Sequence, residues 1–365
     1  MQKCREFIKK YVPVFTLVCS AIAFLSLVLL IISKNSYTFC DAVNSTVCAA
    51  YRFVMAKISS ILPFSIFEVL VYLLLPIIAL LIFVAIRVFR DNVSRVRYLF
   101  TLVGVVLMIF SAYVLALGIP YNVTPLSYRL EMPVVEVNED NLYDTAKILL
   151  DETNALAEKL EFDESGSAIM PYSLGELSEK ISAAYSKVAE KYHFIPDFSS
   201  RVKPIATKDA LSHLHLLGIY TYFTGESNIN VHYPDFNIPY TTAHEFAHQR
   251  GIARENEANF IAFLVCIESD DDFIRYSGYL RLYDYVAGAL YSTNKDRYYD
   301  LLAEMSDAVR GDLIADSEIY KKFANNLLGE ISSKINDFYL KANGTEGEIS
   351  YGLVTRLAVA YYADK

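Results

Sequence analysis

Two histidines stand four residues apart in the segment TTAHEFAHQRGIARENEANF, with a glutamate directly after the first of them. Because residues four apart point to the same side of an α-helix, His244 and His248 can direct two imidazole nitrogens at one metal ion. Glu245 can reach a water molecule at that ion without being a ligand itself. The H-E-x-x-H spacing therefore predicts a zinc site in which a carboxylate helps to activate water.

A catalytic zinc ion usually has three protein ligands and one open position, so a third ligand is expected nearby. The candidates, Glu255 and Glu257, differ by about 200° around the axis of a second helix, so only one of them can face the metal. We expect Glu255 to be the ligand, with Glu257 as the alternative. Asn259 lies one turn beyond Glu255 on the same face and is expected to hold a ligand by a hydrogen bond. Ala258 would let the two helices approach closely.

The residue types also predict the reaction. Two imidazoles and a carboxylate are common ligands of Zn²⁺, which is therefore the expected cofactor. Bound zinc lowers the pKa of its water ligand toward about 7. Glu245 would take the proton of that water during attack on a carbonyl carbon and pass it to the leaving amine. These roles predict amide hydrolysis, with a peptide or protein as the substrate.

The surrounding residues indicate the elements that position this site. Thr241 or Thr242 is a suitable N-cap for the histidine helix, and Gly251 stands where a glycine would end it. Upstream, LHLLGIYTYF and SNINVHY are rich in β-branched and aromatic residues and flank TGE, which predicts two short strands around a turn. Apolar residues at three- and four-residue spacing predict helices on both sides. The expected fold is an α+β, mainly helical domain.

The first third of the chain has a different composition. The protein has 365 residues, is 54% hydrophobic, and has a mean hydropathy of +0.27 and a formal net charge of −9. Apolar runs at about 12–32, 67–86 and 98–117 each have about the length that a helix needs to cross a bilayer. We predict a membrane anchor with three transmembrane helices at 1–120, a linker at 121–138 and a metallohydrolase domain at 139–365. The acidic balance argues against a nucleic-acid partner.

Basic residues predict the orientation of the chain in the lipid bilayer. They gather before the first apolar run and between the second and third, at Lys3, Arg5, Lys9, Lys10, Arg87, Arg90, Arg95 and Arg97. Because cytoplasmic loops carry an excess of Lys and Arg, both segments are expected in the cytoplasm. The protein is then a multi-pass cell-membrane protein with a cytoplasmic N-terminus and an extracytoplasmic catalytic domain. Cys40 and Cys48 lie in the outer loop, where they either form a disulfide or remain free thiols.

The same motifs resemble known proteins. H-E-x-x-H followed by E-x-x-A-N is similar to the gluzincin pattern of zinc metallopeptidases, with His244, His248 and Glu255 at the ligand positions. TGESNIN, HEFAHQRGIARENEANF and SYGLVTRL, together with the three apolar runs, resemble a bacterial membrane family, domain of unknown function 3810, over nearly the whole chain. The resemblance implies a membrane-anchored domain of zincin-like (gluzincin) fold and names no substrate.

Further site residues follow from the likeness to zinc peptidases, in which an edge strand before the metal helix pairs with the substrate. Asn228 and Asn230 would then contact the peptide, and Glu226, in the same substrate-binding strand, would orient a ligand or the turn. A polar hairpin without a role in binding is the alternative. Peptidases of this kind also use a Tyr, His or Arg donor to stabilise the developing oxyanion. Tyr351, in the SYG segment, is expected to take this role.

Two functions of different classes fit these observations. The first is a zinc metallopeptidase acting outside the cytoplasm. The second is a non-catalytic, membrane-anchored binding or sensor protein with a structural or vestigial zinc site. Glu245 argues against the second, because a structural site needs no base. A transporter is a weaker alternative, since three spans with almost no charge inside the membrane offer little to coordinate a solute.

Overall fold

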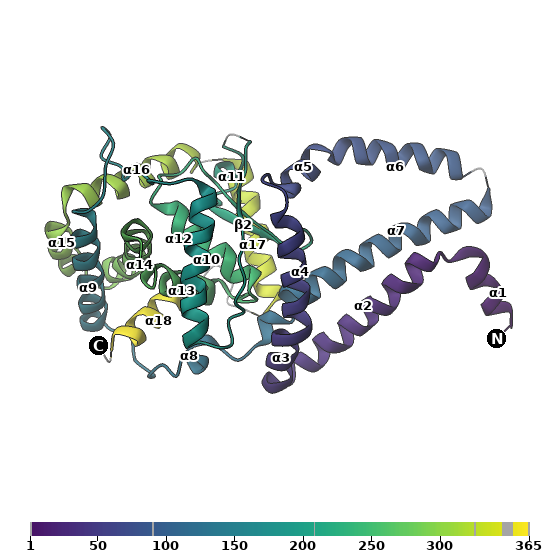
Figure 1. Ribbon diagram of the computed structural model, residues 1–365, viewed down its shortest axis with the longest axis horizontal. Coiled ribbons are helices and arrows are strands. Elements are labelled where there is room, and N and C mark those ends of the chain that lie inside the picture. Colours follow the sequence, from purple (N-terminus) through teal and green to yellow (C-terminus); the bar gives the residue numbers. More distant parts are fainter. Residues whose placement is uncertain (1, 90, 208, 325, 345–352, 364–365) are drawn as a thin grey trace.

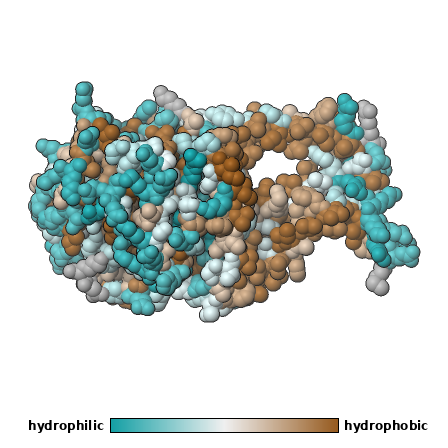
Figure 2. Space-filling view, in the orientation of Figure 1, coloured by the Kyte–Doolittle hydropathy of each residue, from teal (hydrophilic) through white to brown (hydrophobic). Residues whose placement is uncertain are grey.

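Apolar helices extend from one side of a folded, mainly helical domain (Figure 1). The computed structural model describes residues 2–89, 91–207, 209–324, 326–344 and 353–363. The projecting helices have a hydrophobic surface, whereas the surface of the folded domain is largely hydrophilic (Figure 2). The division into a membrane anchor at 1–120 and a metallohydrolase domain at 139–365 stays a prediction.

Two helices in the described part of the chain are long and apolar enough to cross a membrane. They are α2 (Val14–Ser33) and the stretch Asn92–Asn122, which begins with α7 (Asn92–Tyr113). The middle apolar run instead forms two helices, α5 (Ile66–Tyr72) and α6 (Leu74–Val88), bent by 58° at the break between them. A third candidate span exists only if this bent pair counts as one, so a helix of sufficient length and apolarity is found for two of the three predicted transmembrane helices.

A proline accounts for the bend in the middle run. Pro76 is the third residue of α6, so it has no N–H to donate to the carbonyl of Tyr72, and its ring would clash with that carbonyl in a continuous helix. The helix therefore breaks at Leu73. A hydropathy pattern alone does not predict this break in the helix.

The basic segments of the anchor lie at the same far end of the molecule, at α1 (Gln2–Tyr11) and at the turn between α6 and α7 (Figure 1). Arg97 Nη1 donates to the carbonyl of Lys10, which joins the two segments. Between α2 and α5, α3 (Tyr37–Val43), η1 (Asn44–Cys48) and α4 (Ala49–Ser60) connect the anchor to the folded domain. Cys40 and Cys48 are both buried free thiols.

The core of the folded domain is built from helices that bury one apolar face. Capping boxes at Asn138 and Ser173 satisfy the first backbone N–H groups of the two helices predicted upstream of the strands, α9 and α10. Helix α9 packs along α14, and α12 lies between α13, α14 and the sheet. The helices are α8 (Leu126–Arg129), α9 (Glu139–Ala157), α10 (Leu174–Lys191), α11 (Ala210–His213), α12 (Asn237–Gln249), α13 (Glu255–Ile267), α14 (Asp272–Thr293), α15 (Lys295–Glu304), α16 (Asp307–Phe323), α17 (Leu327–Ala342) and α18 (Leu353–Tyr362).

The segment expected to be a linker, at 121–138, is partly folded. It begins within η3 (Pro120–Asn122), the 3₁₀ turn that comes after the π-helical turn η2 (Val114–Gly118) at the end of the long apolar stretch, and it contains α8. Tyr121, Val123 and Leu126 are buried. The connection between anchor and domain is therefore packed at its start, which fixes the anchor beside the elements of the candidate site.

A three-stranded sheet lies beside α12. Its strands are β1 (Val202–Pro204), β2 (Gly218–Thr221) and β3 (Glu226–Ile229), in the order β1-β3-β2. The predicted hairpin is present as the antiparallel pair β2 and β3, and β1 adds to β3 in parallel. Strand β3 is thus the central strand, which corrects the expectation that the SNIN segment is an edge strand open to a substrate.

The histidine helix begins earlier than expected. Helix α12 starts at Asn237, without a side-chain cap, so Thr241 and Thr242 are inside the helix and neither is its N-cap. Pro239 lies in the first turn, where the missing N–H has no partner to lose. The end of the helix is as predicted: Gly251 has a φ of +90°, and the N–H of Ile252 bonds to the carbonyl of Ala247 at 3.0 Å.

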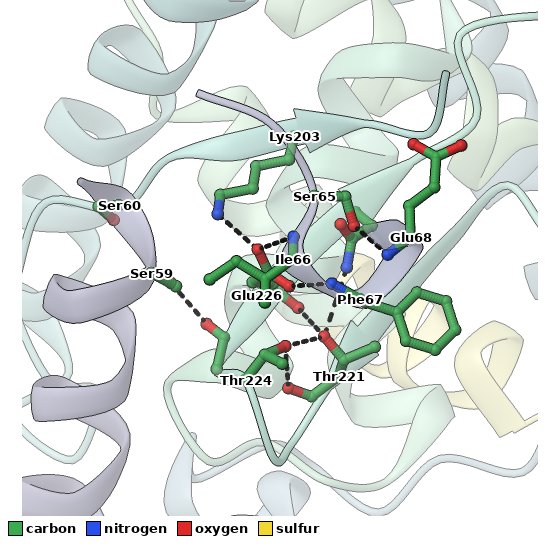
Figure 3. A network of polar contacts seen from close by, with 12 residues as sticks. Ser59, Ser60, Ser65, Ile66, Phe67, Glu68, Lys203, Thr221, Thr224 and Glu226 are labelled. Carbon is green, nitrogen blue, oxygen red and sulfur yellow. Dashed lines mark hydrogen bonds and ion pairs between the residues drawn. The ribbon is translucent and has the colours of Figure 1, made fainter. Parts of the chain in front are cut away.

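A buried ion pair joins the sheet to the bent apolar helices. The carboxylate of Glu226 accepts the backbone N–H groups of Ile66 and Phe67, each at 2.8 Å, and pairs with Lys203 Nζ at 2.5 Å (Figure 3). A second contact joins the same two regions, because Glu68 on α5 accepts the backbone N–H groups of residues 206 and 207, which follow β1. We call Lys203 and Glu226, with the N-terminus of α5, the clamp. Because both charged side chains are fully buried, Glu226 is not placed to bind a substrate.

Candidate metal centre

Three predicted ligands meet where α12 faces the start of α13. His244 and His248 extend from α12, and Glu255 is the first residue of α13. Their ligand atoms all lie within 4.8 Å of one another. The two Nε2 atoms are 3.0 Å apart, and the Glu255 oxygens lie 3.3 Å from His244 Nε2 and 3.5 Å from His248 Nε2. Two imidazole nitrogens and a carboxylate converging on one point fit the donor set of a zinc ion.

Hydrogen bonds orient the two imidazole rings. His248 Nδ1 lies 2.8 Å from the carbonyl of Ile252, so in the neutral imidazole Nδ1 carries the proton and Nε2 has its lone pair for a metal. Asn259 lies in hydrogen-bond reach of His244. Among the described residues, Asn259 Nδ2 and His244 Nδ1 have no hydrogen-bond partner, and rotation of the Asn259 amide by 180° would present its oxygen as an acceptor instead. Asn259 thus lies beside His244, where it can hold this predicted zinc ligand by a hydrogen bond.

Glu257, the alternative ligand, lies in a different set of contacts. Its Oε1 accepts the N–H of Leu126 at 2.9 Å and pairs with Arg254 Nη1 at 2.8 Å. Arg254 Nη2 also donates to the carbonyls of Tyr121 and Val123. Glu257 therefore helps to fix α13 to the C-terminal end of the long apolar stretch and to α8, and the geometry brings Glu255 to the histidines instead.

Glu245, the expected base, is held against the edge strand β2. Its carboxylate accepts the backbone N–H of Tyr220, while among the described residues no hydrogen-bond partner reaches Oε2. A Cβ at Gly218 would come within 2.5 Å of Glu245 Oε1 and 2.8 Å of Thr241 Cγ2. Gly218 is thus required for the close approach of α12 to β2. A glycine inside a segment rich in β-branched residues is a sequence signal for such a close approach.

Burial and mutual charge set the ionisation of these groups. Burial raises the pKa of Glu245 to about 8 and lowers the pKa of His244. Burial also acts on Glu255, but the two histidines outweigh it and hold the pKa of Glu255 well below its usual range. At His248, burial is outweighed by the carboxylates of Glu255 and Glu245 and by a carbonyl, which raise the pKa to about 9. The site therefore already attracts positive charge.

The predicted substrate-binding residues lie inside the sheet. Asn228 is fully buried and donates to the carbonyl of Ile219 and to Thr221 Oγ1, each at 3.4 Å. Asn230 donates to Ser212 Oγ at 2.9 Å and accepts the N–H of residue 232. Together with Glu226 in the clamp, these side chains hold the sheet together, which corrects the substrate-binding assignment. Tyr351, the expected oxyanion donor, falls outside the described residues.

Two tyrosines that are not among the predicted site residues lie beside the metal centre. Tyr121, at the end of the long apolar stretch, and Tyr339, on α17, hydrogen-bond to each other, and their rings are 6.0 Å apart. Both interact electrostatically with Glu255. More than 200 residues separate the two tyrosines in the sequence, so no local pattern could connect them with the histidine motif.

A family model described as "Protein of unknown function (DUF3810)" matches residues 45–359. Because the match covers most of the chain, the protein belongs to this family, as its motifs suggested. No curated protein and no solved structure matches the chain. The likeness to gluzincins accordingly stays a prediction that rests on the residues themselves.

Proposed function

We propose that this member of the DUF3810 family is a membrane-anchored zinc metallopeptidase that cleaves peptide bonds outside the cytoplasm. The observation that carries the proposal is the convergence of His244, His248 and Glu255, whose ligand atoms lie within 4.8 Å of one another. Glu245 adds a buried carboxylate with a free oxygen on the same helix. Ligands and base together are the set required for hydrolysis assisted by a metal and a general base.

The residues of the chain would divide the work in a simple way. Zinc, when bound by the two histidines and Glu255, would supply a Lewis acid and lower the pKa of water. Glu245 would accept a proton from the attacking water and deliver it to the leaving amine. The N–H of Tyr220 fixes one end of the Glu245 carboxylate, and burial, which raises the pKa of this carboxyl to about 8 in the chain without zinc, favours its taking up a proton.

The edge of β2 supports an extended peptide as the substrate. The N–H of Asn230 bonds to the carbonyl of Leu217, and bonded and non-bonded residues alternate along an antiparallel pair. The backbone groups of Gly218 and Tyr220 therefore point away from β3, toward Glu245. A peptide pairing with this edge would lie beside the proposed base, so β2 takes the role that the sequence had assigned to β3.

The charge pattern supports an extracytoplasmic site. The basic segments before α2 and between α6 and α7 lie together at the end opposite to the folded domain (Figure 1). If that end is cytoplasmic, as the positive-inside rule predicts, α2 and α7 place the folded domain on the other side of the membrane.

A non-catalytic binding or sensor protein is the second candidate function, and the cavities favour it. One cavity of about 350 Å³ is lined by residues such as Asp163, His232 and Glu318, and another of about 220 Å³ by Tyr283, Asp284 and their neighbours. The proposed zinc ligands His244, His248 and Glu255 do not line either of these two cavities, and Glu245 does not line them either. Ligand binding at such a cavity would leave the metal with a structural role.

Peptide hydrolysis by the zinc-loaded full chain in nanodiscs tests the proposal. A library of fluorogenic peptides should be cleaved by the wild type, and Glu245→Gln should reduce the rate by about 10²- to 10⁴-fold while zinc stays bound. Glu190→Gln, an exposed substitution on α10, serves as the control and should leave the rate unchanged. Equal rates in wild type and Glu245→Gln would contradict the base assignment. Zinc-loaded wild type that cleaves no peptide would favour the binding protein.

A further inference from the structure

Helix α17 exposes a row of large apolar side chains. They are Leu327, Leu328, Ile331, Ile335 and Phe338, with exposed fractions of 70%, 55%, 45%, 64% and 75%. At 100° per residue these five positions fall within about 100° of the helix circumference. We call them the apolar stripe. Scattered apolar residues on a surface need no explanation, but an uninterrupted stripe along a helix does.

The other faces of α17 show that the stripe does not point into the folded domain. Gly329 and Leu340 are buried and lie on the side of the helix opposite to the stripe. The charged residues of the helix, Glu330, Lys334, Asp337 and Lys341, occupy the arc between about 280° and 340° when Leu327 is set at 0°. The helix is therefore amphipathic, with one face packed on the domain, one charged face and one bare apolar face.

The position of α17 places the stripe near the membrane. The ring of Tyr339 lies 6.4 Å from that of Tyr113 and 6.0 Å from that of Tyr121. The hydroxyl of Tyr113, the last residue of α7, donates to Asn343 Oδ1 at 2.5 Å. Figure 1 shows α17 on the side of the folded domain from which the apolar helices leave, running across their direction. The end of α17 is thus fixed to the outer end of a helix able to span a membrane.

The length of the long apolar stretch gives the level of this contact in the bilayer. A span of about 20 residues counted from Arg97 ends near Leu117. Tyr113 and Tyr121 then stand at the outer boundary of the hydrocarbon, where tyrosines of membrane proteins gather. The hydrophobic surface of the projecting helices extends as far as the place of α4, which connects them with the folded domain (Figure 2).

We propose that α17 is an interfacial helix, which buries the apolar stripe at the boundary between the headgroups and acyl chains of the bilayer that α7 crosses. The occupant is lipid because the helix is attached to the end of the span, lies across it and carries no charge within the stripe. This role goes beyond the proposed function and does not depend on zinc. Because Tyr339 and Tyr121 border Glu255, it would hold the metal centre next to the bilayer surface.

Tryptophan fluorescence of the full chain in nanodiscs tests this proposal. The protein has no tryptophan, so single replacements report without background. Phe338→Trp and Ile335→Trp place the probe on the apolar stripe, and Glu330→Trp places it on the charged face as the matched control. Lipids brominated on their acyl chains should quench the two stripe probes at least threefold more than the control, whereas aqueous iodide should quench mainly the control.

Two stripe positions keep the test decisive if one variant fails to fold. Strong quenching of either probe by brominated lipid, with little quenching of Glu330→Trp, supports the interfacial helix. Equal, weak lipid quenching of the stripe and control probes, together with ready quenching by iodide, would overturn it. A blue-shifted stripe probe that neither reagent reaches would show that protein covers the stripe, which would also overturn the proposal.

Discussion

The clamp and the candidate metal centre are both buried charged clusters, but they differ in how their polar atoms are satisfied. In the clamp, the Glu226 oxygens accept two backbone N–H groups and the ammonium of Lys203. At the centre, two imidazole nitrogens and a carboxylate face one another, and Oε2 of Glu245 has no hydrogen-bond partner among the described residues. Figure 3 shows how completely the first cluster is paired.

This difference separates a structural role from a chemical one. A buried charge is tolerated when its partners satisfy it, so the clamp serves to fix the bent helices on the sheet. At the centre, the converging ligand atoms can be paired only by a proton or by another cation, and Oε2 of Glu245, which has no hydrogen-bond partner among the described residues, can take up a proton. Removing a charge should therefore destabilise the fold when the charge belongs to the clamp, and should abolish zinc binding or activity when it belongs to the candidate metal centre.

Breaking the clamp is expected to have the largest effect on stability. Lys203→Met leaves Glu226 buried without its cation, which should destabilise the fold by about 3 to 5 kcal/mol. Thermal unfolding followed by circular dichroism should show a midpoint lowered by roughly 6 to 20 °C. Zinc bound per folded molecule should not change.

A surface ion pair supplies the control for that experiment. Lys187 pairs with Asp270 at 2.6 Å, and both side chains are substantially exposed. Lys187→Met should cost at most about 1 kcal/mol, because exposed pairs contribute little. If Lys203→Met were no more damaging than Lys187→Met, the clamp would not be the structural attachment described above.

Weakening the support of a ligand should have a smaller effect, confined to the centre. Asn259→Ala removes the side chain behind His244 and should reduce zinc affinity by about 10- to 100-fold, with little change in stability. Competition with a chromophoric chelator measures the affinity. Asn154→Ala, on α9 beside Glu304, is the control. An unchanged zinc affinity in Asn259→Ala would mean that the side-chain amide of Asn259 does not hold the imidazole ring of His244.

The pH dependence of zinc affinity tests the charge states of the centre. His248, with a pKa of about 9 in the chain alone, must lose its proton to bind zinc, whereas Glu255 is already ionised and burial favours neutral His244. Affinity should therefore rise about tenfold per pH unit from pH 7 to 9 and level off above that range. In Glu245→Gln, zinc affinity should still rise with pH, because His248 must still lose its proton to bind zinc. An affinity that stays constant from pH 7 to 9 would refute the assignment.

Local spacing was sufficient to anticipate the convergence at the centre. Residues four apart share a helix face, and the angle between Glu255 and Glu257 allowed only one of them to face the metal. The hairpin and the terminal Gly251 were also readable, because turn chemistry and β-branched runs are local signals. The family, too, was recognisable from short motifs spread over the chain.

Features that depend on distant segments were not readable. Strand β1 precedes the hairpin by more than a dozen residues, and its pairing made β3 central, which placed Asn228 and Asn230 in the interior. Glu226 looked like a site residue because nothing local shows that the N-terminus of α5 would donate its N–H groups to it. The bend at Leu73 required attention to Pro76 rather than to hydropathy. Tyr339 reaches the centre only through tertiary packing.

Metal content is the measurement that tests the metal centre most directly. The purified full chain should bind about one zinc ion as wild type, Glu245→Gln and Glu257→Gln, and should lose it in Glu255→Gln, with folding verified for each by circular dichroism. Of the two glutamates, Glu255 is the one that approaches both histidines, whereas Glu257 is bound by Arg254 and by the N–H of Leu126. Folded wild type without zinc, or folded Glu255→Gln that keeps it while Glu257→Gln loses it, would contradict the assigned centre.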